Sequence, residues 1–333
     1  MTEGLTSNRE SWGLLAGFDA GQTHSRCRLA TWNGRTIAEG QGPGVSHLAA
    51  AGGAERFQTA LTLSLADARV QLPAPWAEAP LQAAAVGASG IEQGSAVQTQ
   101  ALALAAAALG LPLAQLAVSG DERTALRGAF PQGPGIVVIS GTGTIAVGRD
   151  GEGREHRCAG WGWLLDGAGS AMDIGRDGLA LSLQMADGRR ADTPLRAALW
   201  QALAVEPDDP QAAQRIKALV VQPDFGPAGF ARLAPVVAAL ASLGNPEAEA
   251  ILELNGKALA ASVAGVARAL GLTTPPVAAL GGAISHLEGL RQSFRDALHQ
   301  ELPGARLQAP LGDACQGALA MARECTGASS AHA

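Results

Sequence analysis

The strongest constraint on the fold is one motif that occurs in each half of the chain: an apolar strand, a turn of small residues and a returning strand. In the first half, the run Leu14–Asp19 leads through Ala20-Gly21-Gln22-Thr23 into a second apolar run at 25–32. In the second half, Gly135–Ser140 leads through Gly141-Thr142-Gly143-Thr144 into 145–148. The copies are too far apart for a short-period solenoid, so the pattern predicts two similar α/β domains.

The remaining periodicity supports this α/β prediction. Further strands are expected at 36–40, 83–87, 116–119 and 277–280, and helices at 54–66, 96–109, 171–186, 194–205, 210–221, 228–243, 246–271, 285–302 and 313–323. Gly110 and Gly271 are typical helix stops. We expect a first domain over 13–120 and a second over 121–325, with a cleft between them.

Composition and charge exclude several classes of protein. Of 333 residues, 47% are hydrophobic and 16% charged, which is enough apolar material for two cores and excludes a disordered chain. The net charge of −6 and the lack of a long basic stretch argue against a nucleic-acid partner. No apolar stretch reaches the roughly 20 charge-free residues of a membrane span. The polar N-terminus lacks a secretory signal, and four scattered cysteines form no CxxC pair, so we expect a cytoplasmic protein.

Turns of this kind can bind phosphate. Small residues leave successive backbone N–H groups free to form a concave anion site, and threonine adds a hydroxyl donor. Asp19, which precedes the first turn, is suited to hold a hydrated Mg²⁺ rather than phosphate itself. The alternative is that both segments are ordinary tight hairpins. Neither turn matches the Gly-Lys-Ser/Thr phosphate loop or the dinucleotide GxGxxG pattern.

Three segments resemble the nucleotide motifs of the actin, heat-shock-70 and sugar-kinase superfamily. The segment 17–25 is similar to its first phosphate motif, 138–146 to its second and 277–283 to its adenosine motif. The nearest branch is the N-acetylglucosamine kinase and CoA-dehydratase-activator ATPase family. Ala84–Gly90, Gly160-Trp161-Gly162 and the closing Gly317-Ala318-Leu319 also fit that family, so the resemblance covers about residues 14–323.

The resemblance implies a fold, two cofactors and a set of binding residues. The fold would be two ribonuclease-H-like, actin-like ATPase domains that close over ATP and an acceptor. ATP would be bound by Asp19, Gly21, Thr23, Ser25, Gly141, Thr142, Gly143, Gly281 and Gly282. Mg²⁺ would be oriented by Asp19.

The resemblance also implies a general base for the acceptor hydroxyl, and Asp121 matches its position after the strand 116–119. A hydroxyl that attacks a γ-phosphoryl group needs a carboxylate within hydrogen-bond reach to orient it and accept its proton. The alternative is that Asp121 is only the N-cap of the helix that begins near Glu122.

The acceptor side departs from the family pattern. Ser46 or His47 stands where sugar kinases of this type have asparagine, whereas Gly160 and Trp161 match. The family's acidic pair is reduced to Asp166, and Ala168 replaces an acid. Trp161 would be either a flat wall under a sugar ring or a core residue. Asp166 would either reach a sugar hydroxyl or cap its own loop, and His47 would be either a ligand contact or a loop residue.

Three functions follow from this pattern. The first is a kinase that phosphorylates an amino sugar, N-acetylglucosamine or glucosamine. The second is a nucleotide- or sugar-sensing protein derived from such a kinase, which the broken acidic pair would favour. The third is an ATPase that activates a CoA-dehydratase through an iron–sulfur cluster, but Cys158 has no second cysteine nearby. A small-molecule sugar is the expected partner, and a homodimer is one of the oligomeric states left open.

Overall fold

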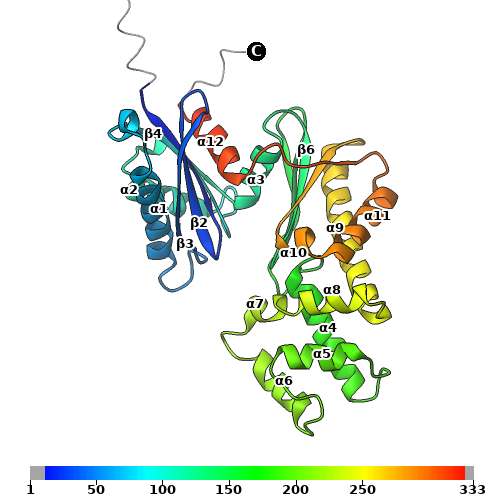
Figure 1. Ribbon diagram of the computed structural model, residues 1–333. Helices are drawn as coiled ribbons and strands as arrows, with labels where there is room; N and C mark the ends of the chain where they lie inside the picture. The colour runs from blue at the N-terminus through cyan, green and yellow to red at the C-terminus, as the bar shows by residue number, and fades with distance from the viewer. Residues whose placement is uncertain (1–11, 327–333) are drawn as a thin grey trace, which may run out of the picture. The chain divides into compact units, whose positions relative to one another are not determined.

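The chain forms two compact units in a computed structural model, and the structure describes residues 12–326 (Figure 1). Of the described residues, 12–132 and 310–326 form the first unit, and Gly133–Ala309 form the second. This division differs from the expected boundary after residue 120. The helix 121–129 and the last helix both pack on the first sheet, so the chain leaves the first unit later than expected and returns to it.

The sheet of the first unit has the strand order β3-β2-β1-β4-β5. Its strands are β1 (Leu14–Ala20), β2 (His24–Thr31), β3 (Thr36–Pro43), β4 (Leu81–Ala88) and β5 (Leu116–Ser119). The first three strands form an antiparallel meander, and β4 and β5 continue the sheet in parallel with β1. Its helices are α1 (Gly53–Val70), α2 (Ala96–Leu109), α3 (Asp121–Ala129) and α12 (Ala314–Glu324), with short 3-10 turns at Ala74–Trp76 and Leu113–Gln115.

Strand alternation divides this unit into two apolar layers. Leu14, Ala16 and Phe18 of β1 belong to the core beneath α1 and α2, and Leu15 belongs to the smaller core beneath α12. Successive side chains of a strand point to opposite faces, so one apolar strand serves both layers. Gly17 lets α12 lie directly on β1, because a Cβ atom at this position would be 2.4 Å from the Cys315 carbonyl oxygen.

The second unit repeats the same topology with the strand order β10-β9-β6-β7-β8. Its strands are β6 (Gly135–Ser140), β7 (Thr144–Arg149), β8 (Glu155–Ala159), β9 (Pro276–Leu280) and β10 (Arg306–Leu307). Strands β6, β7 and β8 form the meander, and β9 and β10 continue it in parallel with β6. The predicted pair of similar α/β domains is therefore confirmed.

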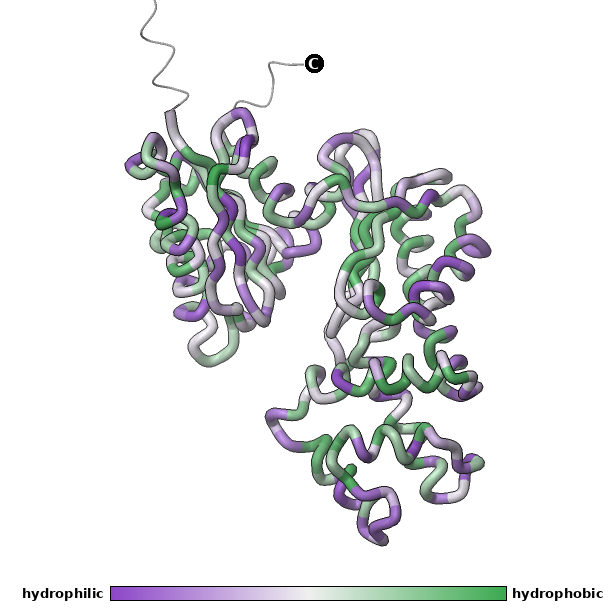
Figure 2. The backbone as a smooth tube through the Cα atoms, viewed as in Figure 1, coloured by the Kyte–Doolittle hydropathy of each residue, from purple (hydrophilic) through white to green (hydrophobic). Residues whose placement is uncertain are grey.

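Helices make up most of the second unit. They are α4 (Ala171–Ala186), α5 (Pro194–Ala202), α6 (Ala212–Val220), α7 (Gly226–Ala231), α8 (Ala234–Ser242), α9 (Pro246–Leu270), α10 (Gly282–His286) and α11 (Glu288–Glu301). By length and composition alone α9 would be able to cross a membrane, but 56% of its most apolar window is buried. Val263, Val266 and Ala267 of α9 pack in the same core as Ile136 and Val138 of β6, so α9 is a core helix of this unit (Figure 2).

Two expected helices are each divided in the structure, and two of its strands were not expected. The helix expected over 228–243 is two helices, α7 and α8, and the proline at position 235 lies in the first turn of α8, where its missing N–H costs nothing. The helix expected over 285–302 is also two, because Leu287 has an extended backbone conformation between α10 and α11. Strands β8 and β10 were not expected. Glu155–Ala159 is polar and only partly buried, so it lacks the apolar signal of a strand.

Candidate functional site

The first phosphate-type turn joins β1 to β2 in the first unit. Its backbone is closed by a hydrogen bond from the Gly21 N–H to the His24 carbonyl oxygen at 3.1 Å. Gln22 and Thr23 at its tip are exposed, so the Thr23 hydroxyl is free to meet a ligand. Asp19 is the penultimate residue of β1, and its side chain is 23% exposed. The structure therefore leaves both the turn and its preceding carboxylate accessible.

The sheet brings Asp19 and Asp121 to the same edge. Asp19 pairs with Gly87 of β4, Gly87 pairs with Ser119 of β5, and Asp121 follows Ser119 by two residues. Because these strands are parallel, their carboxyl ends meet at one edge. Helix α3 is seated there by Thr124, whose Oγ1 would be 2.1 Å from a Cβ atom on Gly87. Only glycine at position 87 lets α3, and with it Asp121, begin this close to the strand ends.

Asp121 has the electrostatic character of a general base. Burial, the neighbouring Glu122 carboxylate and then the Asp19 carboxylate raise the pKa of Asp121 to about 7. Backbone N–H groups of Glu122 and Asp121 itself act in the opposite direction on this pKa. The N-cap position of α3 is Gly120, and Asp121 is the first helical residue. Asp121 is therefore not the N-cap residue of α3.

An arginine pair beside Asp19 was not anticipated from the sequence. Arg26 Nη2 donates to Asp19 Oδ2 at 2.7 Å, and Arg26 Nη1 donates to Asp313 Oδ2 at 3.3 Å. Arg28 donates to both oxygens of Asp313 at 2.7 and 2.9 Å. Asp313 also caps α12 by accepting from the Gln316 N–H at 2.9 Å. The hairpin register, in which Asp19 pairs with Arg26, is the signal that would have revealed the first contact.

The loop expected to contact the acceptor is docked on the first turn. The Val45 N–H donates to the Gly21 carbonyl oxygen at 3.0 Å, and a Cβ atom on Gly44 would lie 2.1 Å from the Gln22 carbonyl oxygen. Glycine at position 44 therefore permits the backbone of the loop to touch the backbone of the turn. Ser46 follows, and its Oγ is buried without a hydrogen-bond partner among residues 12–326. A buried hydroxyl of this kind is available to a ligand.

His47 lies in the same loop and is exposed. Its Nδ1 accepts from the Ala49 N–H at 3.2 Å, and its ring lies against Gly90, which follows β4. The structure thus gathers Ser46 and His47 with the ends of β1 and β4. Nε2 of His47 has no hydrogen bond to any residue between 12 and 326. This geometry fits a ligand contact as well as an ordinary loop residue.

Ser25 is placed differently from the other first-motif residues. Its side chain is fully buried, and its Oγ donates to the Ala60 carbonyl oxygen of α1 at 3.2 Å. The hydroxyl is therefore engaged in packing between β2 and α1. The structure does not bring it to the turn with Gly21 and Thr23.

The second turn joins β6 to β7 in the second unit. The Gly141 N–H donates to the Gly143 carbonyl oxygen at 2.9 Å, and the Gly141 carbonyl oxygen accepts from the Ala171 N–H of α4 at 2.8 Å. Apart from the adjacent residues of the chain, no residue between 12 and 326 has an atom within 4 Å of a Cβ atom built on Gly141 or Gly143, and Thr142 is exposed. The Thr144 hydroxyl is buried and has no hydrogen-bond partner in the part of the chain that the structure describes. Open glycines beside an orphaned hydroxyl form the kind of cradle that binds phosphate.

The adenosine-type motif lies beside this turn. Strand β9 pairs in parallel with β6, and Leu280 is opposite Ile139. Gly281 follows with φ of +100°, and a Cβ atom there would be 2.4 Å from the Ser140 carbonyl oxygen. This backbone conformation and this contact both require glycine. Gly282 then begins α10. The second phosphate-type turn and the adenosine-type motif therefore lie next to each other within the second unit.

The loop from Gly160 to Ser170 presents Trp161 to solvent. Trp161 is 63% exposed, and the Arg157 guanidinium lies 4.7 Å from the centroid of its ring. Trp161 is therefore not a core residue. The Asp166 N–H donates to the Gly162 carbonyl oxygen at 2.8 Å, whereas no hydrogen bond is formed by the Asp166 side chain with the part of the chain described here.

Two buried polar side chains fix the end of this loop. Ser140 Oγ donates to the Gly169 carbonyl oxygen at 2.5 Å, and the Gly169 N–H donates to Asn255 Oδ1 of α9 at 2.7 Å. Ser140 and Asn255 are both fully buried or nearly so. Because Ser140 precedes the second turn, the loop and the turn are held in a fixed mutual arrangement.

Asp173 is a further carboxylate near this loop that the sequence analysis missed. It lies in the first turn of α4, and its N–H donates to the N-cap side chain of Ser170 at 3.1 Å. Burial raises the pKa of Asp173, and so does the charge of Asp166, while the ion-paired Arg176 acts to lower it. Asp166 thus has an acidic neighbour in space, although Ala168 removes the acidic neighbour in sequence.

The residues beside the first turn fit a magnesium ion carried by a nucleotide. Asp19 Oδ2 is occupied by Arg26, and the structure gives Oδ1 no partner among residues 12–326. In the same range there is no group of three or more histidine, cysteine or acidic side chains that could hold a metal ion by themselves. A single carboxylate suits Mg²⁺ that keeps its water ligands and binds phosphate oxygens.

Together, the duplicated α/β units and their glycine-rich turns define an ATPase with the actin-like fold of sugar kinases. A ROK-family glucokinase from Streptomyces griseus, solved with glucose and AMPPNP, shares this fold with a TM-score of 0.54 at 19% identity, and the match covers 93% of this chain and 98% of that one. The chain belongs to the BadF/BadG/BcrA/BcrD ATPase family, whose model matches residues 16–322.

Two proteins that are similar to this chain in sequence are named as amino-sugar kinases. The N-acetylmuramic acid/N-acetylglucosamine kinase of Clostridium acetobutylicum is 29% identical over 216 residues, which are 64% of this chain and 69% of that protein. A provisionally named N-acetylglucosamine kinase from Chromobacterium violaceum has a solved structure with a TM-score of 0.70 and 30% identity, and the match covers 94% of this chain and 99% of that one. The resemblance inferred from the motifs is therefore confirmed.

Proposed function

We propose that this protein is a sugar kinase that transfers the γ-phosphoryl group of ATP to a hydroxyl of an amino sugar, with Mg²⁺ as the metal. The observation that carries the proposal is the position of Asp121. It lies at the carboxyl ends of the parallel strands, beside Asp19 and the first turn, with a pKa of about 7. A base with a pKa near the working pH combines a useful ionised fraction with good proton affinity.

The residues divide the work of the reaction. Asp121 orients the acceptor hydroxyl and takes its proton as the oxygen attacks phosphorus. Thr23, Gly141, Thr142 and Gly143 supply N–H and hydroxyl donors to the phosphate oxygens, and Gly281 and Gly282 provide the surface against which adenosine lies. When bound, Mg²⁺ would neutralise charge on the phosphates, and Asp19 would hold it through water. Ser25 is left out of this set, because its hydroxyl is already bonded within the fold.

The acceptor is proposed to be an N-acetylated amino sugar, and the names of the two relatives support this choice. Ser46 and His47 on the first unit, and Gly160, Trp161 and Asp166 on the second, are the proposed sugar contacts. An exposed indole suits the apolar face of a pyranose ring. The Ser46 hydroxyl and the Asp166 carboxylate form no hydrogen bond with the described residues, which suits them to bind sugar hydroxyl groups.

The experiment that tests this proposal is ADP release with Mg-ATP and a panel of acceptors. The panel contains N-acetylglucosamine, glucosamine, glucose, N-acetylmuramic acid and a sample without acceptor, and Asp121→Asn is assayed beside the natural protein. We expect one amino sugar to raise turnover far above the acceptor-free rate. Asp121→Asn should lower kcat by about 10²- to 10⁴-fold, the usual contribution of a general base, with little change in the KM for ATP. ATP binding without stimulation by any sugar would instead favour a nucleotide- or sugar-sensing role.

A further inference from the structure

Helix α4 follows the loop that contains Trp161 and Asp166, and its third residue, Asp173, has a buried carboxylate. Asp173 is 5% exposed, and its Oδ1 accepts no hydrogen bond from residues 12–326. The Arg176 guanidinium, one turn further along α4, forms an ion pair with this oxygen. A carboxylate has about four lone-pair sites for hydrogen-bond donors, so the ion pair leaves accepting capacity unused.

The carboxylate of Asp173 does not cap its own helix. In a capping box, the side chain of the third helical residue accepts a hydrogen bond from the N–H of the N-cap residue. Here the N-cap residue is Ser170, and its N–H donates to the Gly167 carbonyl oxygen at 3.0 Å instead. Ser170 Oγ accepts from the Asp173 N–H at 3.1 Å, so the cap is formed by the backbone of Asp173 alone. A role in starting α4 therefore does not account for this carboxylate.

Glycine at position 167 leaves room for the Asp173 side chain beside the loop. A Cβ atom on Gly167 would be 3.3 Å from Asp173 Oδ1 and 2.5 Å from Met172 Cε. Two side chains from the first turn of α4 therefore occupy the space into which a side chain at position 167 would point. The loop has no acid at positions 167 and 168, and its carboxylate, Asp166, directly precedes this glycine. The helix thus brings a second carboxylate to the place where the loop has none.

The charges around Asp173 are not balanced. Burial raises the pKa of Asp173 most, Arg176 lowers it, and the carboxylates of Asp177 and Asp166 raise it further. Arg176 Nη2 also lies 3.7 Å from Asp177 Oδ1, so one cation is shared between two carboxylates of α4. A sugar hydroxyl is a neutral donor, so it can bind to an ionised carboxylate here without adding to the repulsion.

We propose that Asp173 is a ligand of the acceptor and that its carboxylate accepts a hydrogen bond from one hydroxyl of the sugar, next to Asp166. This inference rests on the proposed function and deepens it, because it adds a specificity-determining residue from α4 to the contacts of the loop. An acceptor without the hydroxyl in question would leave a buried carboxylate unpaired. Such a loss discriminates strongly between sugars that differ in one hydroxyl.

The test is calorimetry of N-acetylglucosamine binding to Asp173→Asn. We expect the Kd for the sugar to rise by about 10- to 100-fold, the range for one hydrogen bond to a charged group, with the Kd for ATP unchanged. Asp173→Glu keeps the charge but moves the carboxylate by one methylene group, so it should also weaken sugar binding.

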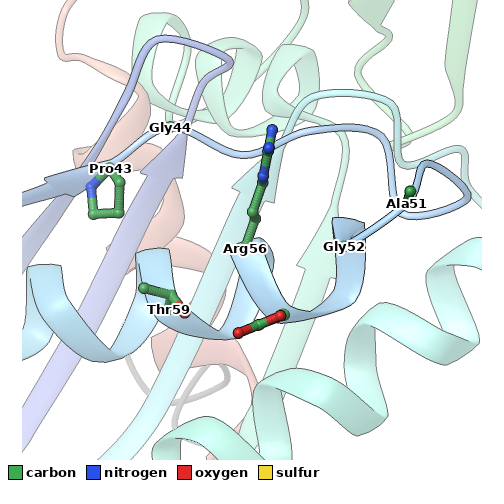
Figure 3. A pocket seen from close by; sticks show the side chains of 7 residues that line it. Pro43, Gly44, Ala51, Gly52, Arg56 and Thr59 are labelled. Carbon is green, nitrogen blue, oxygen red and sulfur yellow. The ribbon is translucent and has the colours of Figure 1, made fainter.

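Glu55→Gln is the matched control. Glu55 is likewise the third residue of its helix, α1, and it lines a pocket of about 570 Å³ in the first unit, which Figure 3 shows beside Arg56 and Thr59. The variant therefore removes an acid from the same helical position outside the proposed sugar contacts. It should leave the Kd for N-acetylglucosamine unchanged.

Analogues of N-acetylglucosamine that each lack one hydroxyl distinguish a direct contact from a structural role. If Asp173 accepts from one hydroxyl, the analogue without that hydroxyl should bind to the natural protein and to Asp173→Asn about equally. The other analogues should remain sensitive to the variant, as in a double-mutant cycle. A structural role would weaken the binding of every analogue by the same factor.

The outcomes separate this inference from the proposed function, because binding needs no turnover. The inference is overturned if Asp173→Asn binds N-acetylglucosamine as the natural protein does, if all analogues lose affinity equally, or if Glu55→Gln shows the same loss. Sugar binding that depends on Asp173 without ADP release would support the inference and contradict the kinase. A natural protein that binds no N-acetylglucosamine would overturn both.

Discussion

Arg26 Nη2 lies 2.7 Å from Asp19 Oδ2, across the hairpin whose turn resembles a first phosphate motif. The arginine is held from its other side by Asp313, the N-cap of the last helix. Neither phosphate-type turn contains lysine or arginine, and Arg26 places a positive charge beside Asp19, the carboxylate proposed to orient the metal. Its charge offsets that of Asp19, which is one of the two carboxylates that raise the pKa of Asp121.

Arg26→Gln should move the pH dependence of activity to higher pH. Without the guanidinium, the Asp19 charge acts on Asp121 without compensation, so the pKa of Asp121 rises further and more base is needed to ionise it. The measurement is kcat/KM for the acceptor between pH 5 and 9. Arg28→Gln is the matched control, because Arg28 pairs with Asp313 and Glu39 but not with Asp19. If both variants moved the pH profile equally, Arg26 would act only by stabilising the ion pairs with Asp313 and not through the charge of Asp19.

The natural protein should gain activity as pH rises through about 7. The general base must be ionised to accept a proton, and burial with two neighbouring carboxylates raises the pKa of Asp121 to about 7. Glu122→Gln removes the larger of these two neighbouring charges, so the rise should occur at lower pH. A flat profile over pH 6 to 8, or a Glu122→Gln profile moved to higher pH, would contradict the assignment of Asp121 as the titrating base.

Asp121→Asn should become more stable relative to the natural protein as pH rises. The folded-state pKa of Asp121 is raised above its ordinary value of 3.8, so this carboxyl stabilises the fold at low pH and loses that contribution as pH rises through about 7. Asparagine does not ionise and avoids the loss. Thermal unfolding at pH 5 and pH 8 measures the difference, which should be larger at pH 8. A difference that does not depend on pH would show that the folded protein does not raise this pKa.

Gly141→Ala should fold normally and lose affinity for ATP. Beyond the adjacent residues, a Cβ atom at this position meets no atom of residues 12–326 within 4 Å, so the fold has no reason to change, but the methyl group would occupy space proposed for the phosphates. Gly281→Ala is the contrasting variant. Its φ of +100° and the Ser140 carbonyl oxygen at 2.4 Å predict a loss of stability as well as of binding. Calorimetry with ATP and thermal unfolding distinguish the two cases, and unchanged ATP affinity in Gly141→Ala would remove the second turn from the site.

Much of the fold and part of the site follow from local pattern. Strands β1 and β6 are short apolar runs that end in turns of small residues, and most of the expected helices have apolar periodicity or clear stops such as Gly110 and Gly271. Strand β8 escaped this approach because its residues are polar and partly exposed. The separation of α10 from α11 was not predicted, because it depends on the extended backbone of one residue, Leu287, which is not a helix-breaking residue type.

The sequence by itself determined the duplicated α/β architecture and the phosphate-type turns, because each strand and turn depends on residues close together in the chain. Asp121 became the candidate base only through the family resemblance. Tertiary structure alone decided which side chains meet. It placed Arg26 and Asp313 around Asp19, turned the Ser25 hydroxyl toward Ala60, and gave Asp166 an acidic neighbour in Asp173. These contacts join positions on different strands and helices, and their charges and hydrogen bonds act through space. A pattern of neighbouring residues in the sequence therefore cannot predict them.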